Sequence, residues 1–236
     1  MHSGKLILLP NVIDDSQSIE SSLPASVSFA VKAVDGIIAE SEKAARKYLR
    51  KFISHEEMQK KTLRLLNEHT KQEDLFDLIA PLLEGKWLGL LTDAGLPCLA
   101  DPGAQIVSLA RARGVIVEAI AGPSSIILAV QLSGLPSQRF GFHGYLPREN
   151  PDLGSMIHTL EKRSQEEKAA QYFIEAPYRS QKLFDELLAI LRKETLLFVA
   201  SNLTGPGEMI VSAPVSHLKK QDIRLGKSPC IFGLYA

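Results

Sequence analysis

Carboxylates, glycines and prolines gather in one short segment, residues 90–103 (LLTDAGLPCLADPG). An apolar run ends there at Thr92, and Asp93, Ala94 and Gly95 follow directly. Ligands of open α/β sheets bind at the carboxyl ends of strands, where such a loop lies. Glycine lets the backbone approach a ligand closely, and carboxylates accept its hydrogen bonds. The segment predicts a loop that holds a polar cofactor; a tight loop fixed by Asp side-chain turns is the alternative.

A second candidate segment is residues 121–125 (AGPSS), between an apolar run and an apolar helix. Free backbone N–H groups at a helix start can bind a ligand oxygen. Simple N-capping by Ser124, without a ligand, explains the same residues. Neither segment contains the glycine spacing of a dinucleotide fingerprint or the Gly-Lys-Ser/Thr of a P-loop.

The first half of the chain alternates short apolar runs with amphipathic patterns. The runs are typical of strands covered on both faces, and they lie at Lys5–Leu9, Gly36–Ala39, Trp87–Leu91 and 115–120. Apolar stripes predict helices at 42–52, Leu75–Leu83 and 106–113. This alternation predicts a mostly parallel sheet with crossover helices.

The second half has a different texture. We expect a helix at Ser125–Leu132, a loop rich in Gly, Pro and aromatic residues at 134–147, and helices at 153–162 and 181–191. Strands are predicted at 171–175, Leu196–Ser201, 209–212 and 229–235, with a hairpin-like turn at 204–207. The fold class is therefore α/β, with a mixed second sheet and two lobes, 1–118 and 119–236.

Composition narrows the class of protein further. Apolar residues make up 45% of the 236, enough for a core without a metal or disulfide. The balance of 27 basic and 27 acidic residues argues against a general basic coat but allows a local patch. Cys98 and Cys230 form no zinc pattern, so no metal is expected. With no signal-peptide pattern or bilayer-length apolar run, we expect a soluble cytoplasmic protein.

One local patch stands out in the predicted helix at 42–52. Its basic side chains recur at helical spacing opposite the apolar stripe of Tyr48 and Phe52, and they are Lys43, Arg46, Lys47, Arg50 and Lys51. Such a face is suited to the phosphates of a nucleic acid. A merely solvated charged face is the alternative.

Together the motifs are far more specific than either alone. The pattern D-A-G-x-P-x-x-x-D-P-G, then GPSS, then GLPSQRF-x-x-x-GYLP resembles the tetrapyrrole (corrin/porphyrin) methylase family. It most resembles the branch that methylates a ribose 2′-hydroxyl of small-subunit ribosomal RNA. Residues 11–16 depart from the family's pattern after its first strand. In the family these positions lie near where the methyl acceptor enters, so the departure bears on which acceptor is used.

The resemblance implies two α/β domains with S-adenosylmethionine (SAM) in the cleft between them, usually in a homodimer. It also implies a set of cofactor contacts by position. These are Pro10, Asp93 and Leu96 from the first lobe, and Ser125, Ile126, Ile174 and Pro229 from the second.

Methyl transfer from a sulfonium is an in-line displacement, so the protein mainly has to align donor and nucleophile. A ribose hydroxyl would also benefit from a base. Asp101 and Glu175 are the candidate catalytic residues, ahead of Asp93 and Glu40. A helix cap is the alternative role for Asp101, and a salt bridge with Arg179 is the alternative for Glu175.

Three functions therefore remain open at the level of sequence. The first is a SAM-dependent methyltransferase acting on a ribose 2′-hydroxyl of small-subunit ribosomal RNA. The second is a methyltransferase acting on a tetrapyrrole or another small molecule. The third is a SAM-binding module without catalysis. The basic helix face favours the RNA substrate.

Overall fold

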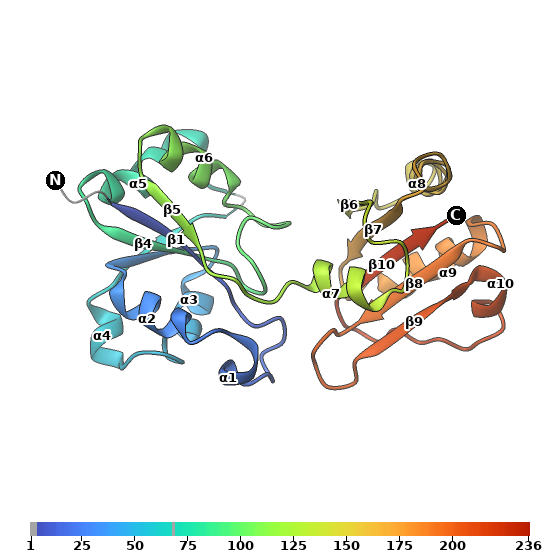
Figure 1. The fold of residues 1–236 in the computed structure, drawn as a ribbon, viewed down its shortest axis with the longest axis horizontal. Helices are drawn as coiled ribbons and strands as arrows, with labels where there is room; N and C mark the ends of the chain where they lie inside the picture. The colour runs from blue at the N-terminus through green and yellow to red at the C-terminus, as the bar shows by residue number, and fades with distance from the viewer. Residues whose placement is uncertain (1–3, 68) are drawn as a thin grey trace. The chain divides into compact units, whose positions relative to one another are not determined.

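The computed structural model describes residues 4–67 and 69–236. Internal contacts divide the chain into two compact units, one ending at Ser124 and the other beginning at Ser125 (Figure 1). The division into an N-terminal α/β lobe, 1–118, and a C-terminal α/β lobe, 119–236, stays a prediction.

The first unit is built on a five-stranded sheet in the order β3-β2-β4-β1-β5, and every pairing in it is parallel. Its strands are β1 (Lys5–Leu9), β2 (Gly36–Ala39), β3 (Thr62–Leu65), β4 (Trp87–Leu91) and β5 (Ile116–Ala119). The predicted parallel sheet is confirmed. Strand β3 was not predicted, because its short sequence TLRL is partly polar and lies at the sheet's edge.

Helices cover both faces of this sheet (Figure 1). They are α1 (Ile19–Ser22), α2 (Ser26–Ala33), α3 (Glu42–Leu49), α4 (His55–Gln59), the 3₁₀ turn η1 (Gln72–Asp74), α5 (Leu75–Leu83) and α6 (Ala104–Ala112). Successive residues of β1 serve opposite faces, as strand geometry requires. Leu6 packs in the cluster formed with α5 and α6, and Ile7 and Leu9 pack in the one formed with α2 and α3.

The second unit contains a mixed five-stranded sheet in the order β6-β7-β10-β8-β9. Its elements are α7 (Ser125–Leu132), β6 (Phe140–Tyr145), α8 (Asp152–Glu167), β7 (Ala170–Glu175), α9 (Ser180–Ile190), β8 (Leu196–Ser201), β9 (Met209–Pro214), α10 (Val215–Leu218) and β10 (Cys230–Tyr235). Strands β6 and β7 are parallel and the other pairs are antiparallel. The predicted mixed sheet is confirmed, and the turn at 204–207 joins β8 to β9.

Part of the predicted loop at 134–147 is in fact strand β6. Its glycines, Gly141 and Gly144, are typical of turns, so the sequence pattern does not predict a strand there. The register with β7 shifts between Phe142 and Tyr145, and Gly144 takes a φ of 62° within that irregularity. Pairing with a distant strand, which local propensity does not encode, decides the structure here. Among the described residues, no helix is both long and apolar enough to cross a membrane.

Candidate functional site

Three loops meet at the carboxyl edge of the first sheet, because β4, β1 and β5 are neighbouring parallel strands. The side chain of Asn11, after β1, donates from Nδ2 to the carbonyls of Thr92 (3.2 Å) and Asp93 (2.8 Å), after β4. Its backbone N–H donates to the Gly95 carbonyl at 2.8 Å. Asn11 is buried, so these bonds are shielded from water and hold the two loops together.

The third loop, after β5, joins the other two through Gly122. A Cβ added there would lie 2.2 Å from Cβ of Pro10 and 3.4 Å from Cδ2 of Leu96. Only glycine permits this approach. Two predicted cofactor contacts, Pro10 and Leu96, are therefore brought to the same point. Pro10 is buried, and its carbonyl accepts a hydrogen bond from the Tyr48 hydroxyl at 2.9 Å.

Carboxylates concentrate at the same edge. The Thr92 hydroxyl donates to Oδ2 of Asp101 at 2.6 Å and lies 3.4 Å from Oε1 of Glu40. Burial raises the pKa of Asp101 and the charge of Asp93 adds to this, although the Thr92 hydrogen bond opposes it. Burial, followed by the charges of Asp101 and Asp93, likewise raises the pKa of Glu40. This edge has an environment that favours a bound cation or a retained proton.

The alternative role of Asp101 as a helix cap is wrong. The N-cap position of α6 is Gly103, and no side chain caps that helix start. Asp101 instead accepts a hydrogen bond from the Thr92 hydroxyl. Its carboxyl group is therefore held at the strand edge, where a ligand would bind.

Asp93 has an exposed side chain, while its backbone is fixed by Asn11. It forms part of a pocket of about 310 Å³ between the loop after β1 and helix α3. The pocket is lined by Asn11, Asp15, Ser41, Lys43, Ala44, Lys47, Tyr48, Lys51 and Asp93. The lining of the pocket thus includes both Asp93 and three lysines.

The predicted basic face lies on α3 and the turn after it, opposite the buried Tyr48. Part of its charge is already neutralised. Lys47 bonds to Asp15, Lys51 Nζ lies 3.5 Å from the same carboxylate, and Arg46 Nη2 lies 2.6 Å from Oε1 of Glu42. The hydrogen bond from Lys47 lowers the pKa of Asp15. Exposed pairs of this kind contribute little stability.

The four predicted contacts from the second unit lie near one end of its sheet or on α7. They are Ser125 and Ile126 at the start of α7, Ile174 near the end of β7, and Pro229 just before β10. Ile126 and Ile174 pack in one hydrophobic cluster. Pro229 precedes Cys230, which pairs with Glu175 next to Ile174. Contact of these four residues with a cofactor stays a prediction.

Glu175 is only 2% exposed; its Oε1 accepts a hydrogen bond, whereas its buried Oε2 has an ion-pair neighbour but no hydrogen-bond partner. Arg179 Nη2 lies 3.0 Å from Oε2, and the backbone N–H of Ala176 donates to Oε1 at 2.7 Å. The expected salt bridge is therefore present. A catalytic role for Glu175 stays a prediction.

Sequence reasoning missed Asn11 and Tyr48 as residues that position this edge. Asn11 directly follows the Pro10 that ends the first apolar run, which is a detectable signal. Its partners lie 81 and 82 residues away and follow only from the strand order. Tyr48 was interpreted as part of an apolar stripe, and its hydroxyl bond has no sequence signal. Within residues 4–67 and 69–236, no group of three or more His, Cys, Asp or Glu is arranged to hold a metal ion.

An all-parallel sheet with helices on both faces and polar loops at its carboxyl edge defines a class of α/β ligand-binding enzymes. The crystal structure of diphthine synthase shares this chain's fold, with a TM-score of 0.69 at 19% identity, covering 99% of this chain and 90% of that one. A family model described as tetrapyrrole (corrin/porphyrin) methylases matches residues 25–219. The chain belongs to the tetrapyrrole (corrin/porphyrin) methylase family and is a methyltransferase.

Several curated relatives carry the name ribosomal RNA small subunit methyltransferase I. The Thermotoga maritima protein is 29% identical over 92% of this chain and 93% of its own length. The Escherichia coli O157:H7 protein is 29% identical over 91% of this chain and 71% of its own. The Vibrio cholerae protein is 32% identical over 71% of this chain, and that match spans 57% of the relative.

Proposed function

We propose that this protein binds SAM at the carboxyl edge of the first sheet and methylates a ribose 2′-hydroxyl of small-subunit ribosomal RNA. The observation that carries the proposal is the crossing of three loops at Gly122, where an added Cβ would meet Pro10. Family membership supports the methyl-transfer chemistry, and the names of the relatives support the RNA substrate.

The residues at this edge suit SAM, whose sulfonium and amino groups are cationic. Glu40, Asp93 and Asp101 supply a negative potential there. Asp93 is exposed and has a fixed backbone, so it is placed to accept a hydrogen bond from the ligand. Gly122 leaves room for backbone to approach closely.

SAM supplies an activated methyl group, and the protein has to align it with the acceptor oxygen. Asn11 fixes the loop that carries Asp93, so the binding group is positioned before the ligand arrives. Asp101 is held by Thr92 and has a raised pKa. We propose that Asp101 is the base that accepts the proton of the ribose hydroxyl, because a carboxylate with a raised pKa is a stronger base.

The acceptor is assigned to RNA on the chemistry of helix α3. Lys43, Lys47 and Lys51 line the pocket that contains Asp93. Their ammonium groups are suited to phosphates beside a reacting ribose. The remaining predicted contacts, Ser125, Ile126, Ile174 and Pro229, together with the homodimer and the cytoplasmic location, belong to this proposal as implications of the family resemblance.

Calorimetric titration with SAM tests the cofactor. We expect Asp93→Asn to weaken SAM binding by roughly 10-fold or more, because a hydrogen bond to a charged group contributes about 1.5–3 kcal/mol. The matched control is Asp77→Asn on α5, an exposed aspartate that lines neither the pocket with Asp93 nor the one at the amino edge. Absence of any SAM binding by the wild-type protein would refute the proposal.

The substrate needs a second measurement. Small ribosomal subunits from cells lacking the gene are incubated with protein and SAM, and ribose methylation is mapped by mass spectrometry. We expect one new ribose methyl group, which Asp93→Asn reduces and Asp77→Asn leaves unchanged. An unchanged map, with SAM still bound, would refute the RNA substrate and direct the search to a tetrapyrrole or another small acceptor.

A further inference from the structure

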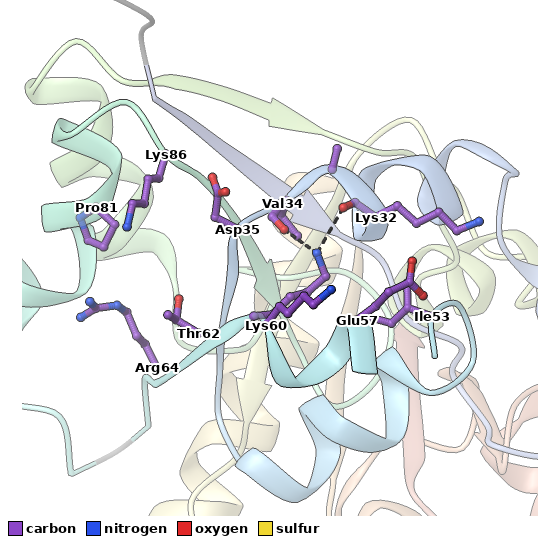
Figure 2. A pocket seen from close by; sticks show the side chains of 12 residues that line it. Lys32, Val34, Asp35, Ile53, Glu57, Lys60, Thr62, Arg64, Pro81 and Lys86 are labelled. Atoms are coloured by element: carbon purple, nitrogen blue, oxygen red, sulfur yellow. Dashed lines mark hydrogen bonds between the residues drawn. The ribbon is translucent and has the colours of Figure 1, made fainter. Parts of the chain in front are cut away.

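A second polar pocket, of about 420 Å³, lies at the opposite, amino edge of the first sheet (Figure 2). Its wall contains five cationic side chains, namely Lys32, Lys60, Lys61, Arg64 and Lys86, and two acidic ones, Asp35 and Glu57. Strands β2, β3 and β4 begin here, at Gly36, Thr62 and Trp87. The pocket is therefore far from the loops that form the proposed cofactor edge.

The carboxylates of both acidic residues in this wall accept hydrogen bonds from backbone N–H groups. The carboxylate of Asp35 accepts from the Trp87 N–H at 2.8 Å. Glu57 closes the capping box of α4 by accepting from the Ser54 N–H at 2.8 Å. Hydrogen bonds from Ser54 lower the pKa of Glu57. The acids thus serve local structure, and the cations outnumber them in the pocket.

Lys61 is a structural part of the wall. Its Nζ donates to the carbonyl of Val34 at 2.5 Å and to that of Lys32 at 3.2 Å. Burial lowers its pKa, while Asp35 and Glu57 oppose this effect. Lys61 therefore adds positive potential from a fixed position.

The remaining cations have unused binding capacity. Lys60 and Lys86 are exposed, and neither takes part in an ion pair found among the described residues. Arg64 donates from Nη1 to the Asp77 carbonyl at 2.8 Å, and its buried Nε has no hydrogen-bond partner. A buried donor without a partner is unfavourable, so a ligand oxygen there would be favoured.

Figure 2 shows how these groups lie. The charged ends of Arg64 and Lys86 both turn toward the side of the pocket where Pro81 lies, and the ammonium of Lys32 points away. Arginine presents neighbouring N–H groups as a planar fork that matches phosphate oxygens, and lysine adds a mobile point charge. The arrangement is thus suited to a tetrahedral anion with several oxygens.

We propose that this pocket is a phosphate-binding site, with Arg64 and Lys86 as its ligands and Lys61 as a fixed positive charge. Lys60, whose exposed side chain extends toward Glu57 in Figure 2, would turn toward the bound phosphate as a further ligand. The phosphate belongs either to the backbone of the substrate RNA or to a free phosphate compound. The RNA source rests on the proposed function. Strands of four or five residues span about 15 Å, so one folded RNA can reach both edges of the sheet.

The test compares the double variant Lys60→Ala/Lys86→Ala with a control, Lys219→Ala/Lys220→Ala. The control removes two exposed lysines of the second unit. The RNA probe is transcribed small-subunit ribosomal RNA, measured by filter binding over a salt series. The small probe is inorganic pyrophosphate, measured by calorimetry. SAM titration of each variant verifies that the cofactor edge is intact.

If the phosphate is in RNA, the double variant binds RNA about 10-fold more weakly, and its log–log salt slope falls by about 2, one unit for each lost phosphate contact. If it is free, pyrophosphate binding is lost and RNA binding is unchanged. If each probe binds the wild-type protein, the double variant and the control with the same affinity, the pocket is not a phosphate site, even when SAM binding is normal. Failure to bind SAM would instead count against the proposed function.

Arg64→Lys provides a second, milder variant. It retains the charge but removes the planar fork, so the salt slope should stay near the wild-type value while affinity for the bound probe falls a few-fold. Unaltered affinity for both probes would exclude Arg64 as a ligand. Because the charge is kept, this result does not depend on general electrostatic attraction.

Discussion

The two edges of the first sheet have opposite chemistry although the same strands form both. At the carboxyl edge, Glu40, Asp93 and Asp101 surround a hydroxyl and a buried amide. At the amino edge, lysines and an arginine surround a pocket whose acids are occupied by backbone donors. Sheets have only a small net dipole, so the contrast comes from side chains. One edge is suited to a cationic cofactor and the other to an anion.

The edges also differ in how they are held. Loops at the carboxyl edge are joined to one another by Asn11 and by the close approach at Gly122. At the amino edge, Lys61 and the two acids are bonded to backbone groups, but the side chains of Lys60 and Lys86 are exposed and can adjust to a ligand. A rigid edge suits the alignment that methyl transfer requires, whereas an adjustable one suits a phosphate held mainly by charge.

Gly122→Ala should break the carboxyl edge most severely. The added Cβ would meet Pro10 at 2.2 Å, so the loop has to move. We expect SAM affinity to fall at least about 10-fold and stability to fall by about 1–3 kcal/mol. Calorimetry and thermal melts measure the two effects. The control is Gly154→Ala in α8, where the atom nearest to an added Cβ is Oδ1 of Asn150 at 3.1 Å; it should leave SAM binding intact. An equal loss of SAM affinity in both variants would contradict a specific role of Gly122 at the carboxyl edge.

Asn11→Ala should loosen the same edge without a steric clash. It leaves the carbonyls of Thr92 and Asp93 without this donor, which costs about 1–3 kcal/mol in a buried place. We expect Tm to fall by several degrees and SAM to bind a few-fold more weakly. Asn67→Ala removes an exposed local bond and serves as the control. A melt and a SAM affinity like those of the wild-type protein would show that Asn11 does not position the edge.

Glu40→Gln should have the smallest effect, and its sign depends on pH. The pKa of Glu40 is raised in the folded protein, so its favourable contribution exists below the ordinary carboxyl pKa and disappears as pH rises through the raised value. Removing the charge should therefore raise Tm at pH 8 by on the order of 1 °C, with no gain near pH 4. Melts at both pH values measure this. The exposed Glu84→Gln is the control, and a Tm decrease at pH 8 would contradict the crowded-carboxylate interpretation.

Much of the fold was readable from local pattern. Dense apolar runs located Lys5–Leu9, Trp87–Leu91 and Leu196–Ser201 at their observed bounds, because strands buried on both faces need nearly every residue apolar. Edge strands lack that signal. Thr62–Leu65 is polar and partly exposed, and Phe140–Tyr145 contains two glycines. Both are strands because a neighbour pairs with them, which only the assembled sheet determines.

The residues of the candidate site likewise divide into those that local sequence predicts and those that depend on the assembled sheet. Asp93 could be found because a carboxylate after a buried strand is a local pattern. The role of Asn11 depends on β1 lying beside β4, and the separation of Asp101 from α6 depends on Thr92 competing for its carboxylate. The amino-edge pocket combines residues from 32 to 86 and has no contiguous motif.

The hydrogen bond from Tyr48 to the Pro10 carbonyl has one further mechanical consequence. Burial raises the pKa of this hydroxyl, so it keeps its proton and its bond throughout the physiological range. The tyrosine therefore connects helix α3 to the loop after β1 through this hydrogen bond. Under the proposed function, an RNA bound to the lysines of that helix would therefore be connected through Tyr48 to Pro10, the residue that Gly122 approaches at the proposed cofactor edge.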